Sequence, residues 1–329
     1  MKLMKKILAV TAVSATAAGT LFADGDGGDF LQISAPGDSS GKKIYTPARS
    51  AVRVREHLIT PFYALYAQRL PSSLSDGGKL ASSSCGSGFS WRYVHPEKTR
   101  IALTTADWLR TDYRFSGGHA SPFRHTDAFS ATTYQELINP KTGFALVGVA
   151  SFTAAAEDRA ALSKGLGGFA ALGAKQYFSE STAVTFGLSA LYRFDRERWF
   201  LYPFLSFDWS ISENLNLRML NGLSLTWDVN GDDSFLLDLS VNYRTSAFAV
   251  ETERDAASPY FGERGAYYEQ RVPVSLTGTW NLTENFFVSA GVTLLAWDKY
   301  RLYRDGHDTD EKFTADPTVE FTLQAGVKF

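Results

Sequence analysis

The sequence predicts an all-β fold: an antiparallel up-and-down transmembrane β-barrel of fourteen strands, with twelve strands plus a small hairpin as the alternative. Three observations predict it. The end of the chain alternates strictly between apolar and polar residues, short and long connections alternate between strand-like segments, and tryptophans recur at the strand ends. The barrel is expected over residues 58–329, with short periplasmic turns and longer outer loops.

The final stretch, residues 317–329, shows the alternation most clearly. Its apolar parity runs from Val319 to Phe329, whereas Glu320 and Lys328 belong to the polar parity. Successive side chains of a strand point to opposite faces, so this strand has one apolar and one polar face. In a soluble sandwich the apolar face would meet a second sheet, whereas in an outer-membrane barrel it would meet lipid.

The amino terminus predicts export. Lys2, Lys5 and Lys6 precede an uncharged stretch over residues 7–23, as in a signal peptide cleaved before Asp24. Removal of residues 1–23 takes away three positive charges and changes the formal net charge from −2 to −5, which argues against a nucleic-acid partner. We interpret residues 24–57, rich in Gly, Asp, Ser and Lys, as a periplasmic arm or partial plug.

The sequence excludes an intramolecular disulfide and a membrane-spanning helix beyond the signal peptide. Cys85 is the only cysteine, so no intramolecular disulfide can form. Beyond the signal peptide no uncharged run reaches the ~20 residues of a membrane helix. A membrane-spanning form of this chain must therefore be a closed barrel, because open sheet edges are not satisfied in lipid.

The connections fix the strand count. Short ones, such as 179–181 and 281–285, alternate with longer, more charged ones, such as 251–264 and 298–315, if Phe329 ends in the periplasm. The alternation fails only between the short connections 210–214 and 229–233. A tight outer turn at Asn221-Gly222 restores it, because Asn-Gly strongly favours a hairpin. The total is then fourteen strands.

The tryptophans form two predicted belts. Trp209, Trp227 and Trp280 each precede a turn of similar pattern and would lie at the periplasmic ends of their strands. Trp108, Trp199 and Trp297 would lie at the outer ends. Amphipathic rings favour the two interfaces of a bilayer, which a soluble sandwich does not offer.

The signal peptide, the repeated turns of the W-x-I-S-E-N type and the terminal VKF resemble Gram-negative outer-membrane β-barrel proteins. The block around YPFLSFDWSISENLNLRMLNGLSLTWDV is similar to an uncharacterised barrel family, a domain of unknown function. The resemblance implies that the barrel assembly machinery recognises the last strand through Phe329. It also implies a location in the cell outer membrane, among lipids and lipopolysaccharide, and it brings no catalytic residues.

Candidate chemistry is sparse. Asp305, His307, Asp308, Asp310 and Glu311 fall together in a predicted outer loop and could orient a water or hold a cation, but a solvated acidic loop is the better interpretation. His119 and His125 are inconclusive, because spacing cannot show convergence. We predict no enzyme activity, no metal and no cofactor; a rim hydrolase is the least favoured alternative.

The lumen is the more promising site. Polar parities of the predicted strands carry charged and amide residues of mixed sign, which would either pair and close the interior or line a wet path. These lumen-lining candidates are Arg92, Arg193, Asp208, Arg218, Asp238, Asn242, Arg244, Glu269, Arg271, Glu320, Gln324 and Lys328. We expect a monomeric, narrow or gated pore for small polar or amphipathic solutes. The alternative is a closed barrel that acts in structure or surface interaction.

Overall fold

The structure, a computed structural model, describes residues 57–95, 97, 99–117, 122–179, 181–219 and 222–329. Sixteen strands form one sheet within these residues, with a single 3₁₀ turn, η1 (Leu162–Gly165). The strands are β1 (His57–Ser73), β2 (Lys79–Val94), β3 (Arg100–Ser116), β4 (His125–Asn139), β5 (Phe144–Glu157), β6 (Leu166–Tyr177), β7 (Thr182–Arg193), β8 (Arg198–Ser212), β9 (Leu215–Met219), β10 (Gly222–Asp228), β11 (Phe235–Asn242), β12 (Arg244–Val250), β13 (Gly265–Thr283), β14 (Phe286–Arg304), β15 (His307–Ala315) and β16 (Thr318–Val327).

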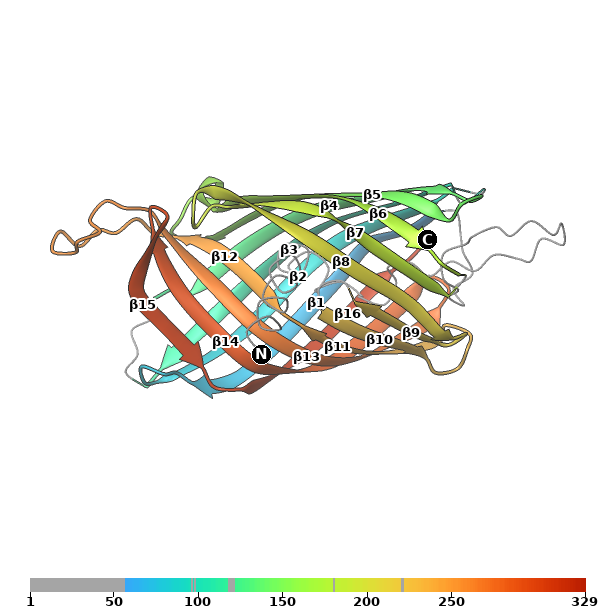
Figure 1. The fold of residues 1–329 in the computed structure, drawn as a ribbon. Helices are drawn as coiled ribbons and strands as arrows, with labels where there is room; N and C mark the ends of the chain where they lie inside the picture. The colour runs from blue at the N-terminus through green and yellow to red at the C-terminus, as the bar shows by residue number, and fades with distance from the viewer. Residues whose placement is uncertain (1–56, 96, 98, 118–121, 180, 220–221) are drawn as a thin grey trace, which may run out of the picture.

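The sheet closes on itself as an antiparallel barrel (Figure 1). It has fourteen barrel strands, which we call staves, because two of them are each made of two of the sixteen shorter strands. β11 and β12 keep one register against β13 and form one stave, as do β15 and β16 against β14. Closure comes from β16 pairing with β1, for example Leu323 opposite Tyr66. The prediction of fourteen rather than twelve strands is confirmed.

Prolines lie at both interruptions. Tyr243 separates β11 from β12, and the ladder to β13 is missing at Asn242 and Tyr243, opposite Pro273 and Val272. Pro273 has no N–H to donate to a ladder. Pro317 lies in the gap between β15 and β16. Beside Pro273, the pairing of β13 with β14 also shifts by one residue, so that Ala296 is bulged out.

The exterior of the barrel is apolar. On β16 the exposed residues are Phe321 and Leu323, at 47% and 53%, whereas Gln324 is buried. On β7 Phe186 and Leu188 are exposed, whereas Thr185 and Ser189 are buried. An antiparallel barrel with an outward apolar face is built to meet lipid hydrocarbon, because in water such a face would be costly.

The two ends of the barrel differ. The end that holds Phe329 has only short connections, such as the one between β13 and β14, and matches the periplasmic end of outer-membrane barrels. At the other end several strands run past the ~9–11 residues that span a bilayer; β13 and β14 each have 19. We refer to this as the outer end.

The predicted loop over residues 298–315 is wrong. Residues 298–315 are not a loop but the upper part of β14, a tight turn at Asp305-Gly306, and β15. Gly306 has a φ of 82° and Asp305 a φ of 39°, the left-handed region that tight hairpin turns require. The longest outer connection in the described residues is 251–264, which was predicted as a loop.

Other predictions fall on residues that the structure does not describe. These are the signal peptide at 1–23, His119, Asn221 and the arm at 24–57, apart from His57, which begins β1. The helical structure in the described residues is too short to cross a membrane.

Candidate functional site: the barrel lumen

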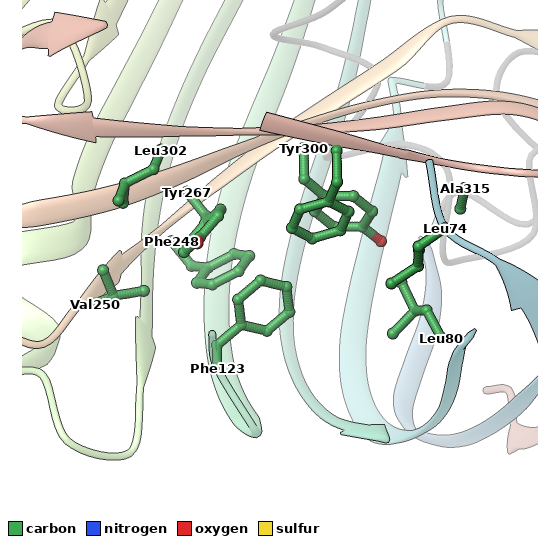
Figure 2. Packing of buried hydrophobic residues seen from close by; sticks show 10 residues of the cluster. Leu74, Leu80, Phe123, Phe248, Val250, Tyr267, Tyr300, Leu302 and Ala315 are labelled. Carbon is green, nitrogen blue, oxygen red and sulfur yellow. The ribbon is translucent and has the colours of Figure 1, made fainter. Parts of the chain in front are cut away.

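Aromatic side chains fill the outer part of the lumen. Phe123, in the connection between β3 and β4, points inward and is 1% exposed. Its ring contacts Tyr113, Phe248 and Tyr267 edge-on at centroid distances of 4.8, 4.9 and 4.8 Å. Figure 2 shows Phe123 beneath rings that come from the opposite wall. We call the group the aromatic seal; its members are Tyr113, Phe115, Phe123, Phe248, Tyr267, Tyr300 and Phe313.

A buried polar network borders the seal. Arg69 Nη1 lies 2.5 Å from Asp298 Oδ2, and Tyr300 contacts both of these side chains at 3.1 Å. Glu269 pairs with Arg271 and accepts a hydrogen bond of 2.7 Å from Ser246. Buried charges need such partners, since an isolated one is costly to remove from water. The network therefore fixes strands β1, β12, β13 and β14 against one another.

Below the seal lies a cavity of about 270 Å³, which we call the chamber. Phe169 and Leu191 line it from β6 and β7, and they belong to an apolar cluster on the inner wall that also includes Val149 and Phe204. Serine and threonine side chains of β2 to β4 line a second side. Charged residues line the chamber from β12, β13 and β16, namely Arg244, Glu269, Arg271 and Glu320.

A second ion network lies nearer the periplasmic end. Lys175 Nζ is 3.5 Å from both Glu136 Oε2 and Asp208 Oδ2, and Arg218 Nε is 3.0 Å from Asp208 Oδ1. Tyr134 donates to Glu136 at 2.6 Å, and Tyr177 donates to its other oxygen. These groups belong to β4, β6, β8 and β9, so they cross-link one side of the wall from within.

The structure places all twelve lumen-lining candidates on the parity opposite the exposed apolar side chains. Four, named above, line the chamber wall of β12, β13 and β16, and Arg193 lines it from β7. Asp208 and Arg218 form the lower network with each other. Asp238 accepts hydrogen bonds from Ser224 and Thr226. The rest are distributed along the wall: Arg92, Asn242, Gln324 and Lys328.

The predicted belt tryptophans all have outward parity. Trp209, Trp227 and Trp280 are 41%, 47% and 43% exposed and lie near the periplasmic turns. Trp199 is the second residue of β8, at the outer end, and is 62% exposed. Trp108 and Trp297 lie partway along their long strands, because those strands continue beyond the expected lipid boundary.

The predicted rim cluster is spread along a strand. Asp305 is in the turn, and the other four residues lie on β15, where alternate side chains take opposite faces. Arg264 pairs with Asp305 at 3.2 Å, and Tyr267 donates to Glu311. His125 pairs with Asp112 on the outward parity of β3 and β4. Within the described residues no group of three or more His, Cys, Asp or Glu side chains could hold a metal ion.

The sequence reasoning missed four lumen residues. Arg69 is not among the predicted lumen residues, and Asp298 and Tyr300 fall in the stretch 298–315 that the sequence predicts as a connection. The bulge at Ala296 reverses the parity of β14, so that both of these face inward although Leu294 and Trp297 face outward. Phe123 carries no periodic signal, because it lies in a connection rather than a strand.

The closed barrel, its apolar exterior and its polar, partly filled lumen define an outer-membrane β-barrel protein. No family model matches the chain, and no curated protein matches it. Among solved structures, the COG4313 outer membrane channel from Pseudomonas putida F1 is 12% identical, covers 90% of this chain and 100% of its own, and gives a TM-score of 0.40. The P. putida toluene transporter TodX is 9% identical over 84% of this chain and 91% of its own, with a TM-score of 0.40. The KdgM porin, solved with disordered oligogalacturonate, is 6% identical over 81% of this chain and 98% of its own, with a TM-score of 0.29. These are likenesses of fold alone.

Proposed function

We propose that this protein is a narrow, gated outer-membrane channel for small amphipathic molecules. The observation that carries the proposal is the two-sided lining of the chamber. Phe169 and Leu191 give it an apolar wall, whereas Arg244, Glu269 and Glu320 give it a charged one. Binding sites for small molecules combine apolar surface with a few placed polar groups in this way.

The aromatic seal is the gate in this proposal. Its rings come from several strands, but Phe123 comes from a connection and lies at their centre. A fourteen-strand barrel is wider than the eight-strand kind that side chains fill completely, so its bore depends on what occupies the lumen. Outward movement of Phe123 would uncover the chamber from the outer end.

The test is single-channel conductance in planar lipid bilayers with a Phe123→Ala variant. Loss of the ring leaves the seal without its central contact, so conductance should rise above that of the wild type. Phe186→Ala is the matched control, because Phe186 is 60% exposed on the outward face of β7 and should leave conductance unchanged. Heat-modifiable migration on a gel shows that each variant is folded.

The seal also favours a second candidate, a closed barrel with a structural or surface-interaction role. No conductance from Phe123→Ala, nor from a protein that lacks residues 24–57, would favour this candidate and overturn the channel. In either case we expect a monomer in contact with outer-membrane lipids and lipopolysaccharide and inserted by the barrel assembly machinery.

A further inference from the structure

The wall of the barrel is interrupted beside β8. β9 and β10 have only 5 and 7 residues, and β9 pairs with β8 only from Phe207 onward. Above that level residues 198–206 of β8 pair with β7 alone among the described residues. At about 3.3 Å per residue, this leaves an edge of about 30 Å without a neighbouring strand.

On the other side of this interruption, β12 is displaced toward the lumen. β12 pairs with β13 along its length, and its other edge has a single bridge, from Ala249 to Ala156 of β5. β5 is not a neighbour of this stave in the barrel order, so the bridge runs across the lumen. The displacement begins where the ladder to β13 is interrupted, at Asn242 and Tyr243, opposite Pro273 and Val272.

Contacts at the rim close the gap from above. Arg196, in the turn between β7 and β8, donates to the Tyr303 hydroxyl of β14 at 3.1 Å. Arg264, just before β13, pairs with Glu197 of the same turn and lies 3.2 Å from Asp305. The interruption is therefore a window, bounded by β8, by β12 and β13, by the end of β9, and by these rim contacts.

The chamber extends around the edge of β12. Ser246 and Phe248 face the lumen, where they contact Glu269 and Phe123. Thr245 and Ala247 have the opposite parity, and the chamber is lined by residues of both parities. It is also lined by Tyr268, on the outward face of β13. Residues 244–248 all line the chamber, so the edge of β12 that faces the window borders it, and Arg193 and Tyr268 line it where they meet.

A cation–π contact spans the window. The guanidinium of Arg193, on β7, lies 3.8 Å from the ring centroid of Tyr268, on β13. Asp195 holds the same guanidinium at 2.5 Å. Such a contact is weak enough to break reversibly at a partly hydrated site. Arg193 is therefore placed as a latch between the two sides of the window.

We infer that this window is a lateral portal through which a small amphipathic molecule passes between the chamber and the outer leaflet of the bilayer. The inference rests on the proposed function and adds the route. Leu201 and Leu205 of β8 are 76% and 50% exposed beside the window, and Trp199 lies above them, so the portal lies at the depth of lipid. Backbone without a partner is tolerated at that depth only where it lines a polar or wet cavity, and residues 244–248 of β12 line the chamber.

The cargo must suit both ends of this route. Apolar side chains on β8 and the tyrosine rings at Tyr243 and Tyr268 suit an apolar or aromatic body. Arg193 and the charged chamber wall suit a polar group on the same molecule. A strictly hydrophilic solute has no route through lipid and would need the axial path past Phe123.

The portal is tested by delivering a thiol reagent from the lipid. The substitution Ser84→Cys places a thiol on the chamber wall of β2. Cys85→Ser removes the native thiol, which is exposed on the exterior. The protein is reconstituted in lipid nanodiscs. N-phenylmaleimide, which dissolves in lipid, is compared by mass spectrometry with the water-soluble cation 2-(trimethylammonium)ethyl methanethiosulfonate.

N-phenylmaleimide should react with the introduced thiol while the seal is intact. Ala247→Trp, which fills the window, should slow this reaction several-fold, whereas Ala150→Trp, on the lipid face of β5, should not. Arg193→Ala removes the latch and should speed the reaction by about twofold to thirtyfold. In a Phe123→Ala background the water-soluble reagent should react, and Ala247→Trp should leave its rate unchanged.

Three results, each obtained with folded protein, would overturn the portal. The first is that N-phenylmaleimide reacts with no variant, and the second is that neither Ala247→Trp nor Arg193→Ala changes the rate of its reaction. The third is that Ala247→Trp slows N-phenylmaleimide and the water-soluble reagent equally. Each is compatible with raised conductance of Phe123→Ala, which would leave the channel proposal standing. Loss of that conductance effect together with any of these results would reject both.

Discussion

Arg69 on β1 pairs with Asp298 on β14 across the place where the stave between them is interrupted. The two side chains are each 1% exposed, and their closest atoms are 2.5 Å apart. β15 ends at Ala315, opposite Asp298, and β16 begins at Thr318. The ion pair thus joins the first and thirteenth staves where the last stave is broken around Pro317.

Removing one member of this pair should destabilise the barrel more than removing both. Arg69→Met or Asp298→Leu alone leaves a buried charge without its partner, at a cost of about 3–5 kcal/mol in the free energy of unfolding. Arg69 Nε and Asp298 Oδ1 have no hydrogen-bond partner in the described residues, so the native pair is itself only partly satisfied. The double variant should therefore be the more stable. Urea unfolding in lipid vesicles measures this, and strictly additive losses would contradict it.

The lower network should depend on Lys175 more than on Arg218. Lys175 is 3% exposed and pairs with both Glu136 and Asp208, whereas Arg218 is 14% exposed and, among the described residues, pairs with Asp208 alone. Lys175→Met leaves Glu136 buried at 0% exposure without a cation, so a loss of about 3–5 kcal/mol is expected, with a smaller loss for Arg218→Met. The same unfolding assay checks the order; a larger loss for Arg218→Met would reject it.

Phe329 should affect assembly rather than the folded barrel. It is 54% exposed beyond the end of β16, so its removal disturbs little packing. The resemblance to outer-membrane barrels implies that assembly machinery reads this residue. Phe329→Ala should lower the rate at which heat-modifiable protein accumulates in the outer membrane while leaving its unfolding midpoint unchanged. Phe286→Ala, an outward-facing aromatic at the same end, is the control.

Much of the wall could be predicted from the sequence because a lipid-facing strand alternates by necessity. The number of barrel strands agrees with the prediction, and β16 lies within the stretch 317–329 and shows the predicted alternation. The upper part of β14 has no strand-like pattern in the sequence, for two physical reasons. Above the bilayer a strand needs no apolar face, and the bulge at Ala296 reverses the alternation just before Asp298.

The candidate site was less predictable. Parity identifies inward residues such as Arg193 and Glu269, but it does not say which of them meet. The seal depends on Phe123, whose position follows from the course of a connection, and the window depends on strand pairing that stops at Phe207. Neither leaves a periodic trace, since both arise from contacts between segments far apart in the chain.

The ring of Phe204 lies on the inner wall against Gly173 and Gly187. A Cβ on Gly187 would come within 2.6 Å of both the Phe204 ring and the Cα of Gly173, and closer still to the carbonyl oxygen of Leu172. Since some of these atoms are backbone, the strands would have to separate, so Gly187→Ala should destabilise the barrel by about 1–3 kcal/mol.

Gly148→Ala is the matched control for that substitution. Its added methyl group would lie 3.7 Å from a Leu172 methyl carbon, an ordinary contact, on the lipid-facing parity of β5. It should be neutral or stabilise by up to about 1 kcal/mol, because alanine restricts the unfolded chain. Urea unfolding compares the two variants. Equal effects would mean that the inner wall does not need its glycines, and that Phe204 can move without disturbing β6 and β7.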